Sequence, residues 1–502
     1  MAATSSRTGM RPTISWSDLR GRAVGIYGLG REGEANLRAC LARGVDPVLV
    51  DDAPGRTHVD GRPLLATAAG GFDALTRCDV VVKTPGISRY GETVRALQRR
   101  GIPVVGGVGL WLAEADRSKV LCVTGTKGKS TTSAIAGHLL TRLGYRCLVA
   151  GNIGLPPHDP QAGSGYDFWI VEISSYQATD LACSPPVVAL TSLHPDHLPW
   201  HRDDPETYYR DKLSACSQPG AELTVANGDS DLIRAHRHLL GPKVHWVHAD
   251  DGTTGSADIA GPAVPVGPAG FAGPLGTAGP PGPGTAGPAG AGTAGPAGAD
   301  AAGDAGDWTR PLGLLGRHNR RNAVIVRACL RALGVPEADD DDALRAAAAG
   351  FAGLDSRLKM IGSVGGVSFV DDSLSTNVLP TLAAVDAFDD RRVALIVGGY
   401  SRGIDYRPLA VGLRGRTLDT FVLTVPDNGP DIRRQVTQTG AGPHVTVVDT
   451  PDLATAVVEG YRWAKPDGVV LLSPAAASFG RFRDYRDRGA AFARAMHNCH
   501  TT

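Results

Sequence analysis

A short glycine-rich loop between two apolar segments constrains the fold of this 502-residue chain more than any other feature. Residues 120–123 have the pattern of a buried strand, and the loop after them leads into an apolar stretch typical of a helix. Glycines let backbone N–H groups face phosphate oxygens, and the start of a helix favours anions. The pattern predicts a nucleoside triphosphate site, in which Lys129 neutralises the β- and γ-phosphates and Ser130 or Thr131 binds Mg²⁺. The predicted triphosphate contacts are Gly125, Thr126, Lys127, Gly128, Lys129, Ser130 and Thr131.

This loop is shorter than the common phosphate-binding pattern. Gly125 stands three residues before Gly128, whereas the common pattern has a spacing of five. A glycine-rich turn that binds no ligand is the alternative interpretation. The succession of strand, loop, Lys-Ser-Thr and helix favours the nucleotide site, because chance seldom places all four in this order.

Charge and cysteine usage exclude several classes of protein. Lys+Arg and Asp+Glu balance at 51 each, so no basic field is available to hold nucleic acid. The eight cysteines include no CxxC pair, which argues against a disulfide framework and a zinc site. No uncharged apolar run reaches the roughly 20 residues of a membrane helix, and the first residues lack the apolar core of a signal peptide. We expect a cytoplasmic protein without membrane insertion.

The first segment, about residues 20–110, has the pattern of a Rossmann-like domain. A strand at its start runs into a glycine turn, and strands alternate with helical stretches, which predicts a parallel sheet. Ligands of such sheets bind at the carboxyl ends of the strands. No hydride-transfer residues follow, so a nucleotide diphosphate is favoured over NAD or FAD. The candidate contacts at these strand ends are Gly28, Leu29, Gly30, Asp51 and Gly86.

Two further α/β segments follow, separated by a stretch of very different composition. From 252 to 306 the chain consists almost entirely of Gly, Pro, Ala and Thr, which cannot build a core and predicts a disordered insertion. The predicted fold class is therefore α/β with three domains: a Rossmann-like N-terminal domain, a central P-loop ATPase-like domain with a parallel sheet, and a Rossmann-like C-terminal domain. Their predicted bounds are 1–113, 114–334 with the insertion, and 335–502.

Metal-binding candidates follow two of the central strands. Glu172 ends one strand and His197 follows another, and a carboxylate and an imidazole beside a phosphate loop suit Mg²⁺ shared with substrate phosphates. A helix-capping or salt-bridging role is the alternative for Glu172. Lys212, fifteen residues after His197, has the wrong charge for a metal ligand.

Taken in order, these motifs resemble the ATP-dependent Mur ligases of peptidoglycan synthesis, within them the enzymes that add glutamate to UDP-N-acetylmuramoyl-L-alanine. The resemblance covers almost the whole chain outside the insertion, and the short loop is the form which that family uses. It implies that Lys212 is carbamylated by CO₂ and so becomes an anionic metal-binding group beside Ser130, Glu172 and His197. It assigns catalysis to Lys129, Glu172, His197 and Lys212.

The resemblance also implies further substrate contacts. Asn152 would contact the muramoyl group, and Asn319 and Asn322 would reach the adenine and ribose, although asparagines here could equally cap the following helix. Arg357 and Asp372, in the third domain, would bind ATP. By position the glutamate contacts would be Thr376, Arg402, Ser478 and Tyr485.

The glutamate motifs depart from those of the D-glutamate enzymes at two cations. Leu374 stands where those enzymes have a lysine, and Arg402 replaces a second lysine. Arg and Lys differ in donor geometry, so the pocket is reshaped. The resemblance is therefore closest to the branch that adds L-glutamate.

The expected protein is a monomeric ligase that uses ATP and Mg²⁺ to join UDP-N-acetylmuramoyl-L-alanine to glutamate through an acyl phosphate. Three alternatives remain open: a D-glutamate ligase of the same step, a related ligase that adds another residue or extends folate or cyanophycin, and a nucleotide-binding protein without turnover.

Overall fold

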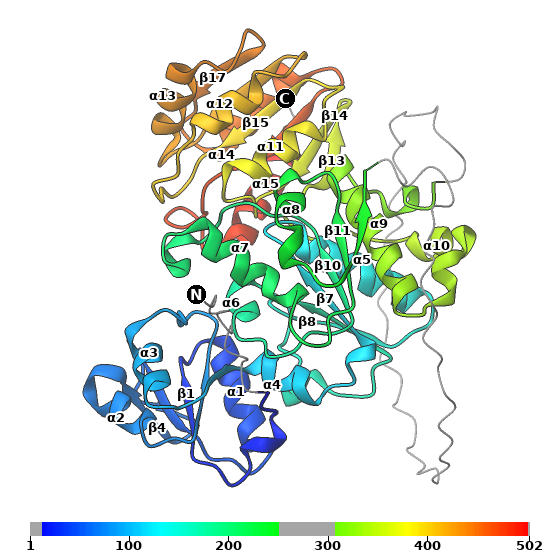
Figure 1. Ribbon diagram of the computed structural model, residues 1–502. Helices are drawn as coiled ribbons and strands as arrows, with labels where there is room; N and C mark the ends of the chain where they lie inside the picture. The colour runs from blue at the N-terminus through cyan, green and yellow to red at the C-terminus, as the bar shows by residue number, and fades with distance from the viewer. Residues whose placement is uncertain (1–12, 250–306, 500–502) are drawn as a thin grey trace, which may run out of the picture.

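The computed structural model describes residues 13–249 and 307–499, and the predicted insertion lies outside the described residues. Three α/β units follow one another along the chain, each built around a six-stranded sheet (Figure 1). The predicted fold class is confirmed. Within the described ranges, no helix is both long and apolar enough to cross a membrane.

The N-terminal sheet has the strand order β3-β4-β2-β1-β5-β6. β3 pairs antiparallel with β4, and the other pairs are parallel. β1 and β5 are buried at every residue because helices cover both faces. The strands are β1 (Val24–Tyr27), β2 (Val48–Asp51), β3 (His58–Val59), β4 (Arg62–Ala66), β5 (Val80–Lys83) and β6 (Val104–Gly106); the helices are α1 (Arg31–Leu41), α2 (Phe72–Leu75), α3 (Glu92–Arg99) and α4 (Gly107–Glu114).

The central sheet is parallel throughout, with the order β12-β11-β10-β7-β9-β8. Its central strand β7 is completely buried and feeds the phosphate loop. The strands are β7 (Val120–Thr124), β8 (Cys147–Gly151), β9 (Phe168–Glu172), β10 (Val187–Leu190), β11 (Leu223–Asn227) and β12 (Lys243–Val247); the helices are α5 (Lys129–Arg142), α6 (Ser175–Ala178), α7 (Pro205–Leu213), α8 (Asp231–Ala235), α9 (Arg317–Ala332) and α10 (Asp341–Ala348).

The C-terminal sheet has the order β13-β14-β18-β15-β16-β17. An antiparallel hairpin of β13 and β14 opens it, and the remaining pairs are parallel. The strands are β13 (Lys359–Val364), β14 (Val367–Asp371), β15 (Val393–Val397), β16 (Thr420–Thr424), β17 (Val445–Asp449) and β18 (Val469–Leu472); the helices are α11 (Val378–Asp386), α12 (Arg407–Leu413), α13 (Gly429–Thr439), α14 (Leu453–Ala464) and α15 (Tyr485–Asn498).

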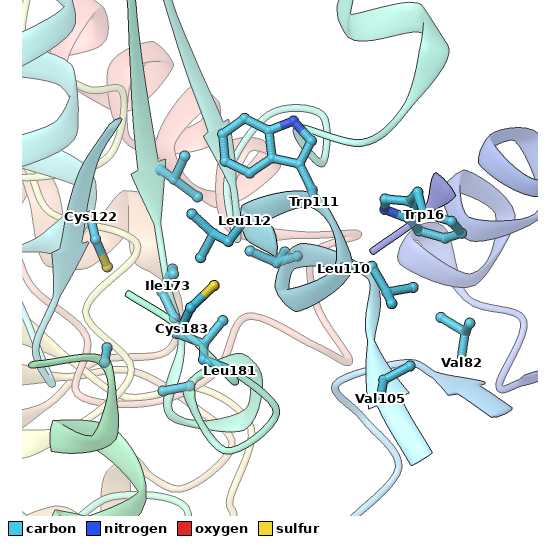
Figure 2. Close-up of a cluster of buried hydrophobic side chains, with 14 of the residues drawn as sticks. Trp16, Val82, Val105, Leu110, Trp111, Leu112, Cys122, Ile173, Leu181 and Cys183 are labelled. Atoms are coloured by element: carbon cyan, nitrogen blue, oxygen red, sulfur yellow. The ribbon is translucent and has the colours of Figure 1, made fainter. Parts of the chain in front are cut away.

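One hydrophobic core joins the first two units. Helix α4 lies between them, and its buried Leu110 and Leu112 belong to the same cluster as Trp16 of the first unit and Ile173 of the second (Figure 2). Burial of such side chains is worth about 1.5–3 kcal/mol each. This shared core holds the carboxyl edge of the first sheet near that of the second.

Helix α10 packs on the central unit. Its Leu344 and Ala347 belong to the core that contains Ile135 of α5 and Ile325 of α9. We propose that the boundary between the second and third domains lies between Phe351 and Lys359 rather than at residue 335.

Candidate active site

The phosphate loop connects β7 to α5 through two glycines with positive φ. Gly125 has φ 138° and Gly128 has φ 86°, conformations that residues with a Cβ rarely adopt. A Cβ on Gly125 would also collide with Thr191 Oγ1. The following residue, Lys129, begins α5, so the free N–H groups of its first turn face the loop.

Two lysines converge on one carbonyl oxygen of this loop. Lys129 Nζ donates to Gly125 O at 2.9 Å and Lys212 Nζ donates to the same oxygen at 3.0 Å. Burial lowers the pKa of Lys129 to about 8. Burial, reinforced by Lys129, holds the pKa of Lys212 well below the ordinary range. This is a site of concentrated positive charge prepared for anions.

Glu172 ends β9 beside these lysines and is 1% exposed. Its Oε1 accepts a hydrogen bond from Asn152 Nδ2 at 2.7 Å, whereas Oε2 has no hydrogen-bond partner among the described residues. Within the described parts of the chain, the Glu172 carboxylate caps no helix and forms no ion pair. A buried free oxygen of this kind is suited to a hard cation.

His197 lies on the loop after β10 in a left-handed conformation, φ 53°. Its Nε2 is 3.7 Å from Asp196 Oδ1, and Lys127 Nζ is 3.1 Å from the other oxygen of that carboxylate. Burial, opposed by Asp196, lowers the pKa of His197, so the imidazole is neutral and able to bind a metal near neutral pH. Within residues 13–249 and 307–499, no group of three His, Cys, Asp or Glu side chains forms a metal cluster.

The C-terminal unit brings an arginine to the phosphate loop. Arg357 Nη2 lies 3.3 Å from Ser130 Oγ, a contact between residues 227 positions apart. Behind it, Asp372 accepts hydrogen bonds from Leu358 N at 3.1 Å and from Ser473 Oγ at 2.7 Å. Burial raises the pKa of Asp372 to about 6. The structure therefore brings Ser130, Arg357 and Asp372 together.

The two predicted asparagines lie in the first turns of α9. Gly316 precedes the helix without a side-chain cap, and Asn319 Nδ2 donates to Leu315 O at 2.9 Å. Asn322 faces the loop, because a Cβ placed on Gly128 would lie 3.2 Å from its Nδ2. The capping alternative does not describe either side chain.

In the N-terminal unit, the backbone N–H of Leu29 donates to Asp51 Oδ2 at 2.7 Å, and Gly28 N donates to Val50 O at 2.8 Å. These bonds fix the glycine turn against the end of β2. Arg31 then reaches the central unit, where its Nη2 donates to Asn152 O at 3.0 Å. Gly30 and Gly86 lie at the same edge of the sheet, and Gly86 O accepts Trp200 Nε1 at 3.3 Å.

Among the predicted glutamate contacts, Arg402 is exposed, and its guanidinium lies 5.5 Å from the ring centre of Phe479. Ser478 precedes that ring and is buried. Tyr485 begins α15 and is close enough to Arg357 to influence its pKa, which burial lowers. Thr376 is half-buried on the loop before α11.

Sequence reasoning missed a buried hydrogen-bonded group that holds α7. His201 Nδ1 lies 2.6 Å from Asp211 Oδ2, its Nε2 lies 3.1 Å from Ser175 Oγ, and Tyr90 OH donates to Asp211 Oδ1 at 2.7 Å. Asp211 directly precedes Lys212, so this group positions Lys212 at the loop. The tyrosine comes from the N-terminal unit, 121 residues away, and no local pattern could have found it.

Three α/β units, with a short phosphate loop on the central one and an arginine of the C-terminal unit beside it, fit the class of ATP-dependent ligases. Comparison with known proteins identifies the family. The Mur ligase middle domain matches residues 123–258, and the Mur ligase glutamate ligase domain matches residues 356–476. The chain belongs to the Mur ligase family.

Similar proteins cover nearly the whole chain. A UDP-N-acetylmuramoyl-L-alanine–L-glutamate ligase from a Micromonospora species is 38% identical and covers 96% of this chain and 97% of its own. The enzyme of the same name from Salinispora tropica is 38% identical, with 96% and 98% covered. The MurF ligase of Thermotoga maritima in complex with ADP has a TM-score of 0.52 at 13% identity, with 98% of each chain covered, and shares the fold.

Proposed function

We propose that this enzyme adds L-glutamate to UDP-N-acetylmuramoyl-L-alanine. ATP phosphorylates the alanyl carboxylate, the glutamate amine attacks the resulting acyl phosphate, and ADP and phosphate leave. The observation that carries the proposal is that both outer units reach the carboxyl edge of the central sheet, through Arg31 on Asn152 O after β8 and Arg357 on Ser130 Oγ at the phosphate loop. The names of the similar ligases support the substrates.

In this proposal the chain supplies positive charge to the phosphates and positions the substrates. Lys129 and Arg357, from two units, face the transferring phosphoryl group and stabilise the charge that develops on it. The backbone N–H groups of the loop cradle the remaining phosphates. No side chain of the enzyme forms a covalent bond to substrate, because the acyl phosphate already activates the carboxylate.

The residues at the loop fit Mg²⁺. Glu172 Oε2 is buried without a partner among the described residues, and Ser130 Oγ and the neutral His197 lie at the same edge. When bound, Mg²⁺ would neutralise phosphate charge and polarise the phosphoryl oxygens. The set lacks a second anionic ligand until Lys212 is modified.

Carbamylation of Lys212 fits the same geometry. CO₂ reacts with a neutral amine, and the lowered pKa of the buried Lys212 favours that form. The reaction joins the amine nitrogen to the carbon of CO₂ and releases one proton. It replaces a neutral amine by an anion and so pairs Lys129 with an opposite charge.

The test is ADP release by the purified protein. Release should require ATP, UDP-N-acetylmuramoyl-L-alanine and glutamate together, and the product should contain one added glutamate by mass. Lys129→Met serves as the inactive control. ADP release that ignores either co-substrate would contradict the proposal.

A further inference from the structure

A short loop of the N-terminal unit is hydrogen-bonded across the interface to the central unit. The loop, residues 86–90, lies between β5 and α3 and starts at Gly86, a predicted contact of the UDP-sugar. Ser88 Oγ donates to Trp200 O at 3.0 Å, and Trp200 Nε1 donates back to Gly86 O at 3.3 Å. We call residues 86–90 the docking loop, because these bonds hold it against the central unit.

The docking loop ends in a tyrosine whose side chain is restricted by several contacts. Tyr90 N donates to Ser88 Oγ at 3.2 Å, and the Arg202 guanidinium lies 5.7 Å from the centre of the Tyr90 ring. The ring is half-buried and meets the ring of Trp200 edge-on, with 6.1 Å between the two centres. Held in this way, the Tyr90 hydroxyl donates to Asp211 Oδ1 of the central unit at 2.7 Å.

Each carboxylate oxygen of Asp211 has a hydrogen-bond partner. Oδ1 accepts from Tyr90, whereas Oδ2 lies 2.6 Å from His201 Nδ1. His201 is completely buried, and its Nε2 lies 3.1 Å from Ser175 Oγ at the start of α6. The buried Asp211 carboxylate is therefore held by the N-terminal unit through one oxygen and by the central unit through the other.

Asp211 and Lys212 are consecutive residues in the last turn of α7. Successive side chains of a helix point about 100° apart, so a fixed Asp211 sets the direction in which the Lys212 side chain leaves the helix. That direction takes Lys212 Nζ to Gly125 O of the phosphate loop, at 3.0 Å. When this nitrogen joins the carbon of CO₂ and one proton leaves, the resulting carbamate needs the same placement to stay beside the loop.

We propose that Tyr90 is a positioning residue for the Lys212 carbamate, because through Asp211 it holds the last turn of α7. The reaction centre of the central unit is then complete only with the docking loop of the N-terminal unit in place. The inference rests on the proposed function and adds to it a residue that lies outside the central unit. If the docking loop only joined the two units, its loss would change stability and leave the carbamate unaffected.

A bicarbonate titration of Tyr90→Phe, which removes only the hydroxyl, tests this assignment. The carbamate carbon resonance from isotopically labelled bicarbonate and the rate of ADP release are followed in parallel. The bicarbonate concentration for half-maximal carbamate should rise at least about tenfold, because the loss of a hydrogen bond to a charged group typically costs that factor or more. High bicarbonate should restore the resonance and most of the turnover.

Tyr166→Phe is the matched control. Tyr166 is half-buried, and its hydroxyl donates to Ala162 O at 2.8 Å. It precedes β9 and so lies at the edge of the central sheet opposite the phosphate loop. The bicarbonate response of Tyr166→Phe should equal that of wild type, even where thermal unfolding shows a loss of stability similar to that of Tyr90→Phe.

A double-mutant cycle checks that Tyr90 acts through Asp211. Asp211→Ala should raise the half-maximal bicarbonate concentration at least as far as Tyr90→Phe does. Adding Tyr90→Phe to Asp211→Ala should cause no further rise, since both changes remove the same hydrogen bond. If Tyr90→Phe does not fold, Ser88→Ala, which frees the docking loop from Trp200, takes its place with a rise again expected.

A bicarbonate response of Tyr90→Phe equal to that of wild type would overturn this assignment, whatever happens to stability. A wild type that ligates glutamate without a carbamate resonance would instead remove the carbamate from the proposed function, and this assignment with it. A wild type that shows the carbamate but ligates no glutamate would contradict the proposed function, and the carbamate titration would still decide this assignment.

Discussion

Removal of the Lys212 amine should abolish most of the ligation activity without lowering the stability of the folded protein. Its Nζ and that of Lys129 both lie within 3.0 Å of Gly125 O, so the two nitrogens are under about 6 Å apart. Two like charges at that separation would repel by about 3 kcal/mol at an effective dielectric constant of about 20, which, with burial, favours the neutral form of Lys212. An anionic carbamate on Lys212 would instead attract the Lys129 ammonium by a similar amount.

Lys212→Met should therefore leave the folded protein as stable as wild type measured without CO₂, or more so, because it replaces a buried amine by an apolar side chain of similar length. Ligation should fall by at least a hundredfold, which corresponds to about 3 kcal/mol of lost transition-state stabilisation. Thermal unfolding and ADP release measure the two effects on the same preparation.

Chemical rescue and direct detection complete this test. Acetate should restore part of the activity of Lys212→Ala, because its carboxylate can occupy the place of the carbamate. With isotopically labelled bicarbonate, a carbamate carbon resonance should be seen in wild type and be absent from Lys212→Met. Near-normal ligation by unassisted Lys212→Ala would refute the reasoning.

Four further outcomes follow from the structure and the sequence. Lys129→Ala should abolish ligation, since it leaves phosphate charge unbalanced, and near-normal turnover in a ligation assay would contradict the loop assignment. Arg357→Met should lower kcat about a hundredfold with little change in the KM for glutamate, because the arginine meets the loop rather than the acceptor site. Burial raises the pKa of Glu32 to about 7, so the folded state keeps a proton that the unfolded state releases above pH 4.5. The contribution of Glu32 to the free energy of unfolding, up to about 3 kcal/mol, is lost as pH rises through 7. Denaturant unfolding at pH 5 and at pH 8 should show that Glu32→Gln loses less free energy of unfolding between the two than wild type does. Replacing residues 256–303 by a short Gly/Ser linker should leave turnover near that of the parent, and a large loss in a folded variant would reveal an overlooked role.

Local patterns predicted the strands that carry the site. β1, β5, β7, β9 and β10 are continuous apolar runs that end in glycine or polar residues, and such runs signal parallel strands buried on both faces. The phosphate loop and Glu172 were found for this reason, since each follows a strand, whereas the role of Lys212 came from the family resemblance alone. The structure then places them around Gly125 O and the loop.

Features that depend on distant residues were not predictable in this way. The antiparallel pairing of β13 with β14 depends on a hairpin at two glycines with positive φ, Gly365 and Gly366. The support of Lys212 by His201, Asp211 and Tyr90 spans two units. Arg488 resembles any other arginine of an amphipathic helix until its burial is known.

The choice of enantiomer tests the central claim most directly. Product formation from ATP and UDP-N-acetylmuramoyl-L-alanine should be measured with L-glutamate and with D-glutamate at equal concentration. Inverting the α-carbon exchanges two substituents, so one enantiomer must leave a charged group unpaired, a mismatch of about 2–5 kcal/mol when that group is buried in the closed complex. We predict that L-glutamate reacts at least tenfold faster. A clear preference for D-glutamate would contradict the claim and return this chain to the D-glutamate-adding branch, with its fold and phosphate loop unchanged.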